Sequence, residues 1–226
     1  ALVGNQNSGK TTLFNLLTGT NQKIGNWPGV TVECKTGRYK KDKNIAIQDL
    51  PGTYSLSPYT LEEQVTRNYL RETPPDVLLN IIDATNLERS LYLTLQLMEF
   101  NIPIVIALNM SDLLEYQGKQ IDIEKLSYSL GLPVVLTSAL KKKGLDEAIR
   151  KACQPLEVTP LDYDHRLESA LGEIQTICPQ AKNRFEQIKL FEGDSLALNS
   201  LTASQGQELD EIVTITEKIM GDDRES

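Results

Sequence analysis

A segment near the start of the chain has the residue types needed to hold a phosphate group. Gly4 and Gly9 enclose four residues and are followed by Lys10 and Thr11, which fits Gly-x-x-x-x-Gly-Lys-Thr. The glycines let backbone N–H groups turn toward phosphate oxygens, Lys10 adds a positive charge, and the Thr11 hydroxyl suits Mg²⁺. The residues predicted to line this phosphate site are Gly4, Asn5, Asn7, Ser8, Gly9, Lys10, Thr11 and Thr12.

A second motif indicates which base the nucleotide carries. Asn109-Met110-Ser111-Asp112 follows an apolar run, at the place where Asn-Lys-x-Asp recognises guanine. A carboxylate there accepts hydrogen bonds from N1–H and the 2-amino group of guanine, and adenine offers no such donor pair. Because methionine replaces the usual lysine, we expect weaker binding and faster release of the nucleotide. The residues predicted to surround the base are Asn109, Met110, Asp112, Ser138, Ala139 and Leu140, with the Ala139 N–H facing guanine O6.

Two further segments are expected to respond to the γ-phosphate. Asp49-Leu50-Pro51-Gly52 fits Asp-x-x-Gly, in which Asp49 holds Mg²⁺ through water and the Gly52 N–H contacts the γ-phosphate. Thr31 lies in a loop rich in glycine and asparagine, where a Mg²⁺-sensing threonine belongs. Loops of this kind become ordered when γ-phosphate and Mg²⁺ bind. The predicted Mg²⁺ ligands are Thr11, Thr31 and, through water, Asp49, and the loop residues predicted to contact nucleotide are Gly29, Val30 and Thr31.

The motifs lack a side chain that would orient the attacking water. The residue after Gly52 is a threonine, where many nucleotide hydrolases have glutamine. Arg67 and Arg71 are interpreted as the solvated face of a helix, and Glu62 and Glu63 as acidic partners of its N-terminal dipole. We therefore expect slow intrinsic hydrolysis, which depends on positioning and charge contributed by Lys10, Thr31 and Gly52.

The elements that must position these residues follow from the hydrophobic pattern. Up to residue 154, short apolar runs alternate with amphipathic segments, which is typical of βα units on a mostly parallel sheet. Helices are expected to begin near residues 10, 60, 90, 122 and 144. The six predicted strands are residues 1–4, 32–39, 44–50, 77–83, 104–109 and 134–137.

After residue 155 the strand pattern stops and helical periodicity takes over. Helices are predicted over 167–174, 183–191 and 205–220, and the apolar stripe of the last is expected to be core. The predicted organisation is an α/β nucleotide-binding domain over 1–154 and a small all-α domain over 155–226.

Composition excludes several classes of protein. The net charge of −8 argues against nucleic acid as a partner, and no basic patch is apparent. Three cysteines without Cys-x-x-Cys spacing and a single histidine argue against a disulfide framework or a zinc site. No apolar stretch is long enough for a membrane helix. Because the chain begins inside a predicted strand, we expect further residues upstream.

The motifs together resemble the cytosolic N-terminal region of FeoB, a family of prokaryotic ferrous-iron transporters. The resemblance depends on residues 4–15, 25–33, 49–56 and 83–89 and extends over the whole chain. It implies a Ras-like P-loop GTPase domain followed by a helical domain similar to a GDP-dissociation inhibitor. It also implies a membrane domain beyond this chain, a place at the cytoplasmic face of the bacterial inner membrane, small accessory proteins and homo-oligomers. The family usually has proline where this chain has Gln6, a change from which we expect little effect.

The resemblance also gives a role to Asn7. GTPases with asparagine at this loop position resemble those activated by potassium, which implies that Asn7 and the carbonyls of Gly25 and Trp27 hold K⁺. The alternative is that Asn7 only supports a turn. The expected ligands are therefore GTP or GDP, Mg²⁺ and K⁺, and Asn7 joins Lys10, Thr31 and Gly52 as a predicted catalytic residue.

The predicted function is GTP hydrolysis by a cytosolic regulatory module of a ferrous-iron transporter, with the helical domain relaying the state of the switch loops. One alternative is that GTP acts mainly as a gating ligand with slow turnover. Another is a free-standing small GTPase in ribosome or RNA biology, against which the net charge argues.

Overall fold

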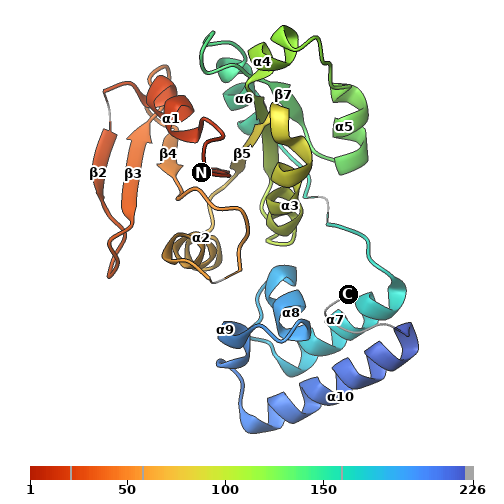
Figure 1. Cartoon of the computed structure of the whole chain (residues 1–226). Coiled ribbons are helices and arrows are strands. Elements are labelled where there is room, and N and C mark those ends of the chain that lie inside the picture. Colours follow the sequence, from red (N-terminus) through yellow and green to blue (C-terminus); the bar gives the residue numbers. More distant parts are fainter. Residues whose placement is uncertain (21, 58, 159, 222–226) are drawn as a thin grey trace. The chain divides into compact units, whose positions relative to one another are not determined.

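The computed structural model describes residues 1–20, 22–57, 59–158 and 160–221. The chain divides into two compact units (Figure 1). The first comprises Ala1–Met98 and Ile102–Thr159, and the second comprises Glu99–Asn101 and Pro160–Ser226. No helix among the described residues has the length and apolar character needed to cross a membrane.

The first unit is built on a seven-stranded sheet in the order β2-β3-β4-β1-β5-β6-β7. Pairing is parallel among β4, β1, β5, β6 and β7, whereas β2 and β3 add an antiparallel hairpin at one edge. The strands are β1 (Leu2–Gly4), β2 (Gln22–Asn26), β3 (Glu33–Arg38), β4 (Ala46–Asp49), β5 (Leu78–Asp83), β6 (Ile104–Asn109) and β7 (Val134–Leu136). The predicted α/β architecture is confirmed.

The predicted count of six strands was one too low, because β2 carries no strand pattern. Its sequence Gln-Lys-Ile-Gly-Asn has a single large apolar residue, Ile24, and that side chain is 64% exposed. Edge strands that face solvent have no buried side to impose alternation. Pairing with β3, from Gln22 opposite Gly37 to Asn26 opposite Glu33, therefore defines this strand.

Helices cover both faces of the sheet. Leu79 and Ile81 of β5 pack in one core cluster with Phe14 of α1 and Ile149 of α6. Asn80, which points to the opposite face, donates a 2.7 Å hydrogen bond to the Thr94 hydroxyl of α3. The helical segments of this unit are α1 (Lys10–Thr18), α2 (Leu61–Glu72), η1 (Ala84–Asn86), α3 (Leu87–Met98), α4 (Ser111–Tyr116), α5 (Ile123–Leu130) and α6 (Leu145–Ala152).

The second unit is helical, as predicted. Its described helices are α7 (His165–Ile177), α8 (Arg184–Phe191), α9 (Ser195–Leu198) and α10 (Ala203–Met220). Leu171 and Ile174 of α7 pack against Leu209 and Val213 of α10. The expected core stripe of α10 is only partly correct, because Ile215 and Ile219 are 57% and 58% exposed.

Candidate nucleotide-binding site

The loop between β1 and α1 has the close packing expected of a phosphate loop. A Cβ on Gly4 would lie 2.3 Å from the Ile81 carbonyl oxygen, so no larger residue fits. Gly9 adopts φ 87°, and a Cβ there would lie 2.3 Å from Nδ2 of Asn109. Asn7, at φ 63°, occupies the left-handed region that asparagine tolerates well, within a turn closed by Ser8 N–H donating to Asn5 O.

The predicted phosphate lysine and the predicted magnesium carboxylate lie together. Lys10 Nζ is 2.5 Å from Asp49 Oδ1, and both residues are buried. Burial raises the pKa of Asp49, while the adjacent Lys10 opposes that shift. Thr11 follows Lys10 in the first turn of α1, and its hydroxyl is a hard oxygen donor of the kind that Mg²⁺ prefers.

Asn109 connects the predicted base motif to the phosphate loop. Its Nδ2 donates to the Ser8 carbonyl at 2.8 Å, and its Oδ1 accepts from the Ala139 N–H at 3.0 Å. The Thr137 hydroxyl also points at Oδ1, at 3.4 Å. Three loops distant in sequence are thus joined through one buried amide, and guanine O6 would have to share the Ala139 N–H with it.

Asp112, the carboxylate of the base motif, is also held in place. Ser138 is buried, and its hydroxyl donates to Asp112 Oδ1 at 2.5 Å while accepting from the Lys141 N–H at 3.0 Å. Met110 adopts φ 63° at the N-terminus of α4, and Leu140 is 80% exposed. The carboxylate predicted to bind guanine is therefore fixed by a buried hydroxyl.

The predicted switch threonine lies in the turn that joins β2 and β3. The Trp27 N–H donates to Val32 O at 2.9 Å, the Val30 N–H donates to Trp27 O at 3.2 Å, and Gly29 adopts φ 77°. Thr31 is exposed within this turn. In the described part of the chain, the hydrogen bonds of this turn stay within the hairpin. Gly25 is placed in β2 opposite Cys34, on the same hairpin as Trp27.

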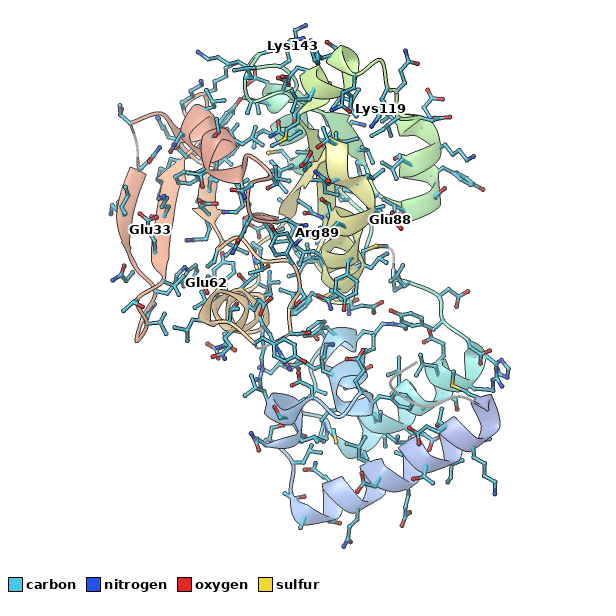
Figure 2. The ribbon with its side chains drawn as sticks, in the orientation of Figure 1. Glu33, Glu62, Glu88, Arg89, Lys119 and Lys143 are labelled. Carbon is cyan, nitrogen blue, oxygen red and sulfur yellow. The ribbon has the colours of Figure 1, made fainter. Side chains whose placement is uncertain are left out.

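The loop after Gly52 is anchored to α3. The guanidinium of Arg89 lies 4.0 Å from the centre of the Tyr54 ring, and Gln96 Oε1 accepts from the Leu56 N–H at 2.7 Å. Figure 2 shows the Arg89 side chain beside this loop. Positions 89 and 96 are seven residues apart, so both side chains come from one face of the helix. Gly52 itself lies against Gln6 of the phosphate loop.

The acidic and basic residues of α2 have different roles. Glu63 forms a capping box with Thr60, as its interpretation as a helix N-terminal residue predicts, and also accepts from the Ser55 hydroxyl at 3.2 Å. The interpretation of Arg67 as solvated was wrong, because its side chain is only 7% exposed. Three consecutive residues from Val65 to Arg67 are buried, so α2 is enclosed on more than one face.

Comparison with known proteins identifies the family. The family model "Ferrous iron transport protein B" matches residues 1–152, and the model "FeoB cytosolic helical domain" matches residues 163–226. The chain belongs to the FeoB family. It is 42% identical over 206 residues to the Fe(2+) transporter FeoB of Escherichia coli K12 and 51% identical to that of Salmonella choleraesuis. These alignments cover 85% of this chain but only 26% and 27% of the two relatives, so the chain spans about a quarter of their length.

Solved FeoB structures share the fold of this chain. A GDP-bound point mutant of S. thermophilus NFeoB has 52% identity and a TM-score of 0.93, with 99% of this chain and 91% of that chain covered. S. thermophilus NFeoB bound to GDP·AlF4⁻ and K⁺ has 52% identity and a TM-score of 0.89, with the same coverage. The chain therefore has a GTPase fold of the FeoB type.

Arg89 and Gln96 were missed as supports of the site. Arg89 closes the run 83–89 that carries part of the FeoB resemblance, which was the available signal. Nothing in the spacing indicated Gln96, since a lone glutamine on an amphipathic helix is ordinary. Among the described residues, no group of three or more His, Cys, Asp or Glu side chains is arranged to hold a metal ion.

Proposed function

We propose that this chain binds guanine nucleotides and hydrolyses GTP as the regulatory module of a ferrous-iron transporter. The observation that carries the proposal is the pair of hydrogen bonds from Asn109, which join the phosphate loop at Ser8 to the base loop at Ala139. With Asp112 fixed by Ser138, the same edge of the sheet presents groups for a phosphate and for a guanine base. Related FeoB structures that were solved with GDP and with GDP·AlF4⁻ support this ligand class.

Within this site the residues have separate roles. Lys10 and the backbone N–H groups of the loop would hold the phosphates, and the Gly52 N–H would contact the γ-phosphate. Thr11, Thr31 and, through water, Asp49 are the proposed ligands of Mg²⁺, which supplies charge neutralisation on the phosphate oxygens when bound. Because no glutamine follows Gly52, we expect slow intrinsic turnover.

We also propose that Asn7, with the carbonyls of Gly25 and Trp27, holds K⁺ beside the phosphates. Support comes from a relative that was solved with K⁺ and from the exposure of Asn7 in the loop. A cation there would neutralise charge that develops in phosphoryl transfer, a role that no arginine was predicted to fill.

The test compares GTP hydrolysis in K⁺ and in Na⁺ at equal ionic strength. Asn7→Gly keeps the left-handed turn without strain, whereas Asn7→Ala adds about 1–2 kcal/mol of backbone strain at φ 63°. We expect a K⁺ advantage in the unmodified chain and its loss in both variants. If Asn7→Gly keeps that advantage, the potassium site is not at Asn7. If hydrolysis is absent in every salt while GDP binds, GTP is a gating ligand for this chain.

We propose residues 1–154 as the GTPase domain and 155–226 as the helical domain that relays its state. The two family matches, 1–152 and 163–226, lie within these bounds. The proposed partner is a membrane domain of the whole transporter, which places this chain at the cytoplasmic face of the bacterial inner membrane. Small accessory proteins and further copies of the chain complete the proposed partners.

A further inference from the structure

Two lysine-rich loops lie side by side in the first unit. The turn between β3 and β4 carries Lys40, Lys41 and Lys43, and the loop between β7 and α6 carries Lys141, Lys142 and Lys143; all six are exposed. Asp146 joins the loops, since it accepts from the Tyr39 hydroxyl at 2.5 Å and pairs with Lys41 Nζ at 2.6 Å. Lys40, Lys41 and Lys142 line one small hollow of about 70 Å³.

This cluster has a charge opposite to that of the rest of the chain. With Arg38 it holds seven basic residues, against four acidic residues, Asp42, Asp112, Glu115 and Asp146, which gives a net charge of +3. Because the whole chain has −8, the remainder carries −11. The expectation that no basic patch exists was therefore wrong, because segments separated by about a hundred residues converge here. Nitrogen-tipped side chains extend outward around Lys143 in Figure 2.

Exposed apolar side chains lie within the same cluster. Leu140 is 80% exposed and directly precedes the three lysines. Tyr116 is 91% exposed and follows Glu115, whose carboxylate pairs with Lys141 at 2.8 Å. Exposed apolar side chains that lie next to lysines are typical of surfaces that enter the headgroup region of a bilayer. We call these residues, Lys40, Lys41, Lys43, Tyr116, Leu140, Lys141, Lys142 and Lys143, the lysine face.

The backbone beneath the lysine face is fixed. Ser138 and Lys143 exchange two main-chain hydrogen bonds, of 3.1 and 3.0 Å, which close the loop that presents Leu140, Lys141 and Lys142. The turn after β3 is held where the Lys40 N–H donates to Leu17 O at 2.8 Å. A surface whose loops are already ordered loses little conformational entropy on binding.

We propose that the lysine face binds the anionic lipid headgroups of a bilayer. A bilayer meets one face of a protein, so the acidic remainder stays in solvent, screened beyond about 8–10 Å. A long nucleic acid would extend past the lysines toward that acidic surface and be repelled by it. Its phosphate backbone would also not bury the exposed, apolar side chain of Leu140. Leu140 also belongs to the residues predicted to surround the base, so the contact is tested at Lys40, Lys142 and Tyr116, none of which belongs to the predicted nucleotide-binding residues.

The test is co-sedimentation of the 226-residue chain with vesicles. One set contains phosphatidylcholine alone, and the other contains phosphatidylcholine mixed with phosphatidylglycerol. We expect binding to the mixed vesicles only, and weaker binding as salt rises. Each lysine lost should lower the partition coefficient about fivefold, so Lys40→Glu/Lys142→Glu should lower it about 25-fold or more. Tyr116→Ser should weaken binding without any change in charge.

A matched control changes the net charge by the same amount elsewhere. Lys182→Glu/Lys218→Glu reverses two exposed lysines of the second unit and should leave vesicle binding within about twofold of the unmodified chain. GTP hydrolysis measured on all variants shows that each is folded. The proposal is overturned if the mixed vesicles do not bind, if the control loses as much as the lysine-face variant, or if the chain prefers RNA to the vesicles.

Discussion

The hydroxyl of Ser138 donates a 2.5 Å hydrogen bond to Oδ1 of Asp112. Ser138 is buried, and its oxygen also accepts from the Lys141 N–H, so its orientation is fixed from both sides. One oxygen of the proposed guanine-binding carboxylate is therefore aligned before any base arrives. An interaction with an already oriented carboxylate has a smaller ordering cost.

Ser138→Ala should accelerate release of GDP. A hydrogen bond to a charged group contributes about 1.5–3 kcal/mol, so we expect a dissociation rate at least about tenfold higher. Stopped-flow displacement of a fluorescent GDP analogue measures this rate. Ser127→Ala is the matched control, because it removes a 2.6 Å hydrogen bond to Leu132 O outside the proposed site. Equal release rates in the two variants would show that Ser138 does not position Asp112.

Comparing Gly9→Ala with a control glycine should distinguish a steric clash at the site from the strain of a left-handed backbone. The new Cβ would lie 2.3 Å from Nδ2 of Asn109, which must then leave Ser8 O. Gly19→Ala is the control, since Gly19 also has a positive φ, 62°, but has nothing within 4 Å of the added carbon.

We expect both variants to lose roughly 1–2 kcal/mol of stability from the left-handed backbone. Only Gly9→Ala should also weaken GDP binding, by at least about tenfold, because it displaces the hydrogen bonds of Asn109. Thermal unfolding and titration calorimetry with GDP report the two effects separately. Normal GDP affinity in Gly9→Ala would mean that Asn109 is dispensable.

Met110→Lys should slow the release of GDP. Both side chains would start from the same left-handed backbone at φ 63°, so the comparison isolates what the side chain does. The lysine stem covers the purine as methionine can, and its ammonium adds roughly 0.5–1 kcal/mol, or about two- to fivefold in rate. Met110→Leu controls for the apolar contact. Unchanged release from Met110→Lys would refute the expectation drawn from this position.

Glu99→Gln should change how the stability of the second unit depends on pH. Glu99 is 2% exposed, accepts from the Tyr163 hydroxyl at 3.0 Å and lies 2.8 Å from Arg184 Nε. Burial raises the pKa of Glu99 by more than Tyr163 and Arg184 lower it. A raised pKa means that the protonated form favours folding, so this contribution is present at acid pH and is lost as pH rises through the raised value.

The measurement compares urea unfolding of the unmodified chain and Glu99→Gln between about pH 5 and pH 7.5. The free energy of unfolding of the unmodified chain should fall relative to that of the variant as pH increases. The difference removes contributions from other titrating groups. A difference that rises with pH would show that Arg184 outweighs the cost of burying the carboxylate.

The sequence predicted the buried strands well because their pattern is strong. β5 and β6 are continuous apolar runs covered on both faces, and the predicted and observed bounds of β6 agree. β2 was missed because its exposed edge imposes no alternation, and the six-residue helix α4 is too short to show a period. Segment 99–101 belongs to the second unit through tertiary packing, which no local pattern could indicate.

At the site, the sequence motifs predicted which residues take part but not which of them contact one another. The proximity of Lys10 to Asp49 and of Asn109 to Ser8 depends on which strand ends lie at the same edge of the sheet. The burial of Arg67 could not be predicted, because its charge favours solvent and only tertiary packing encloses it. The stacking of Arg89 on Tyr54 likewise follows from where α3 lies.

Trp27 gives the chain an optical reporter of the turn that joins β2 and β3. It is the only tryptophan in the sequence, and its ring meets that of Tyr69 on α2 edge to face, with centroids 5.4 Å apart. Movement of the turn after β2 relative to α2 would change the surroundings of this one indole. Its emission spectrum can therefore follow the loop in the unlabelled protein, with no engineered fluorophore.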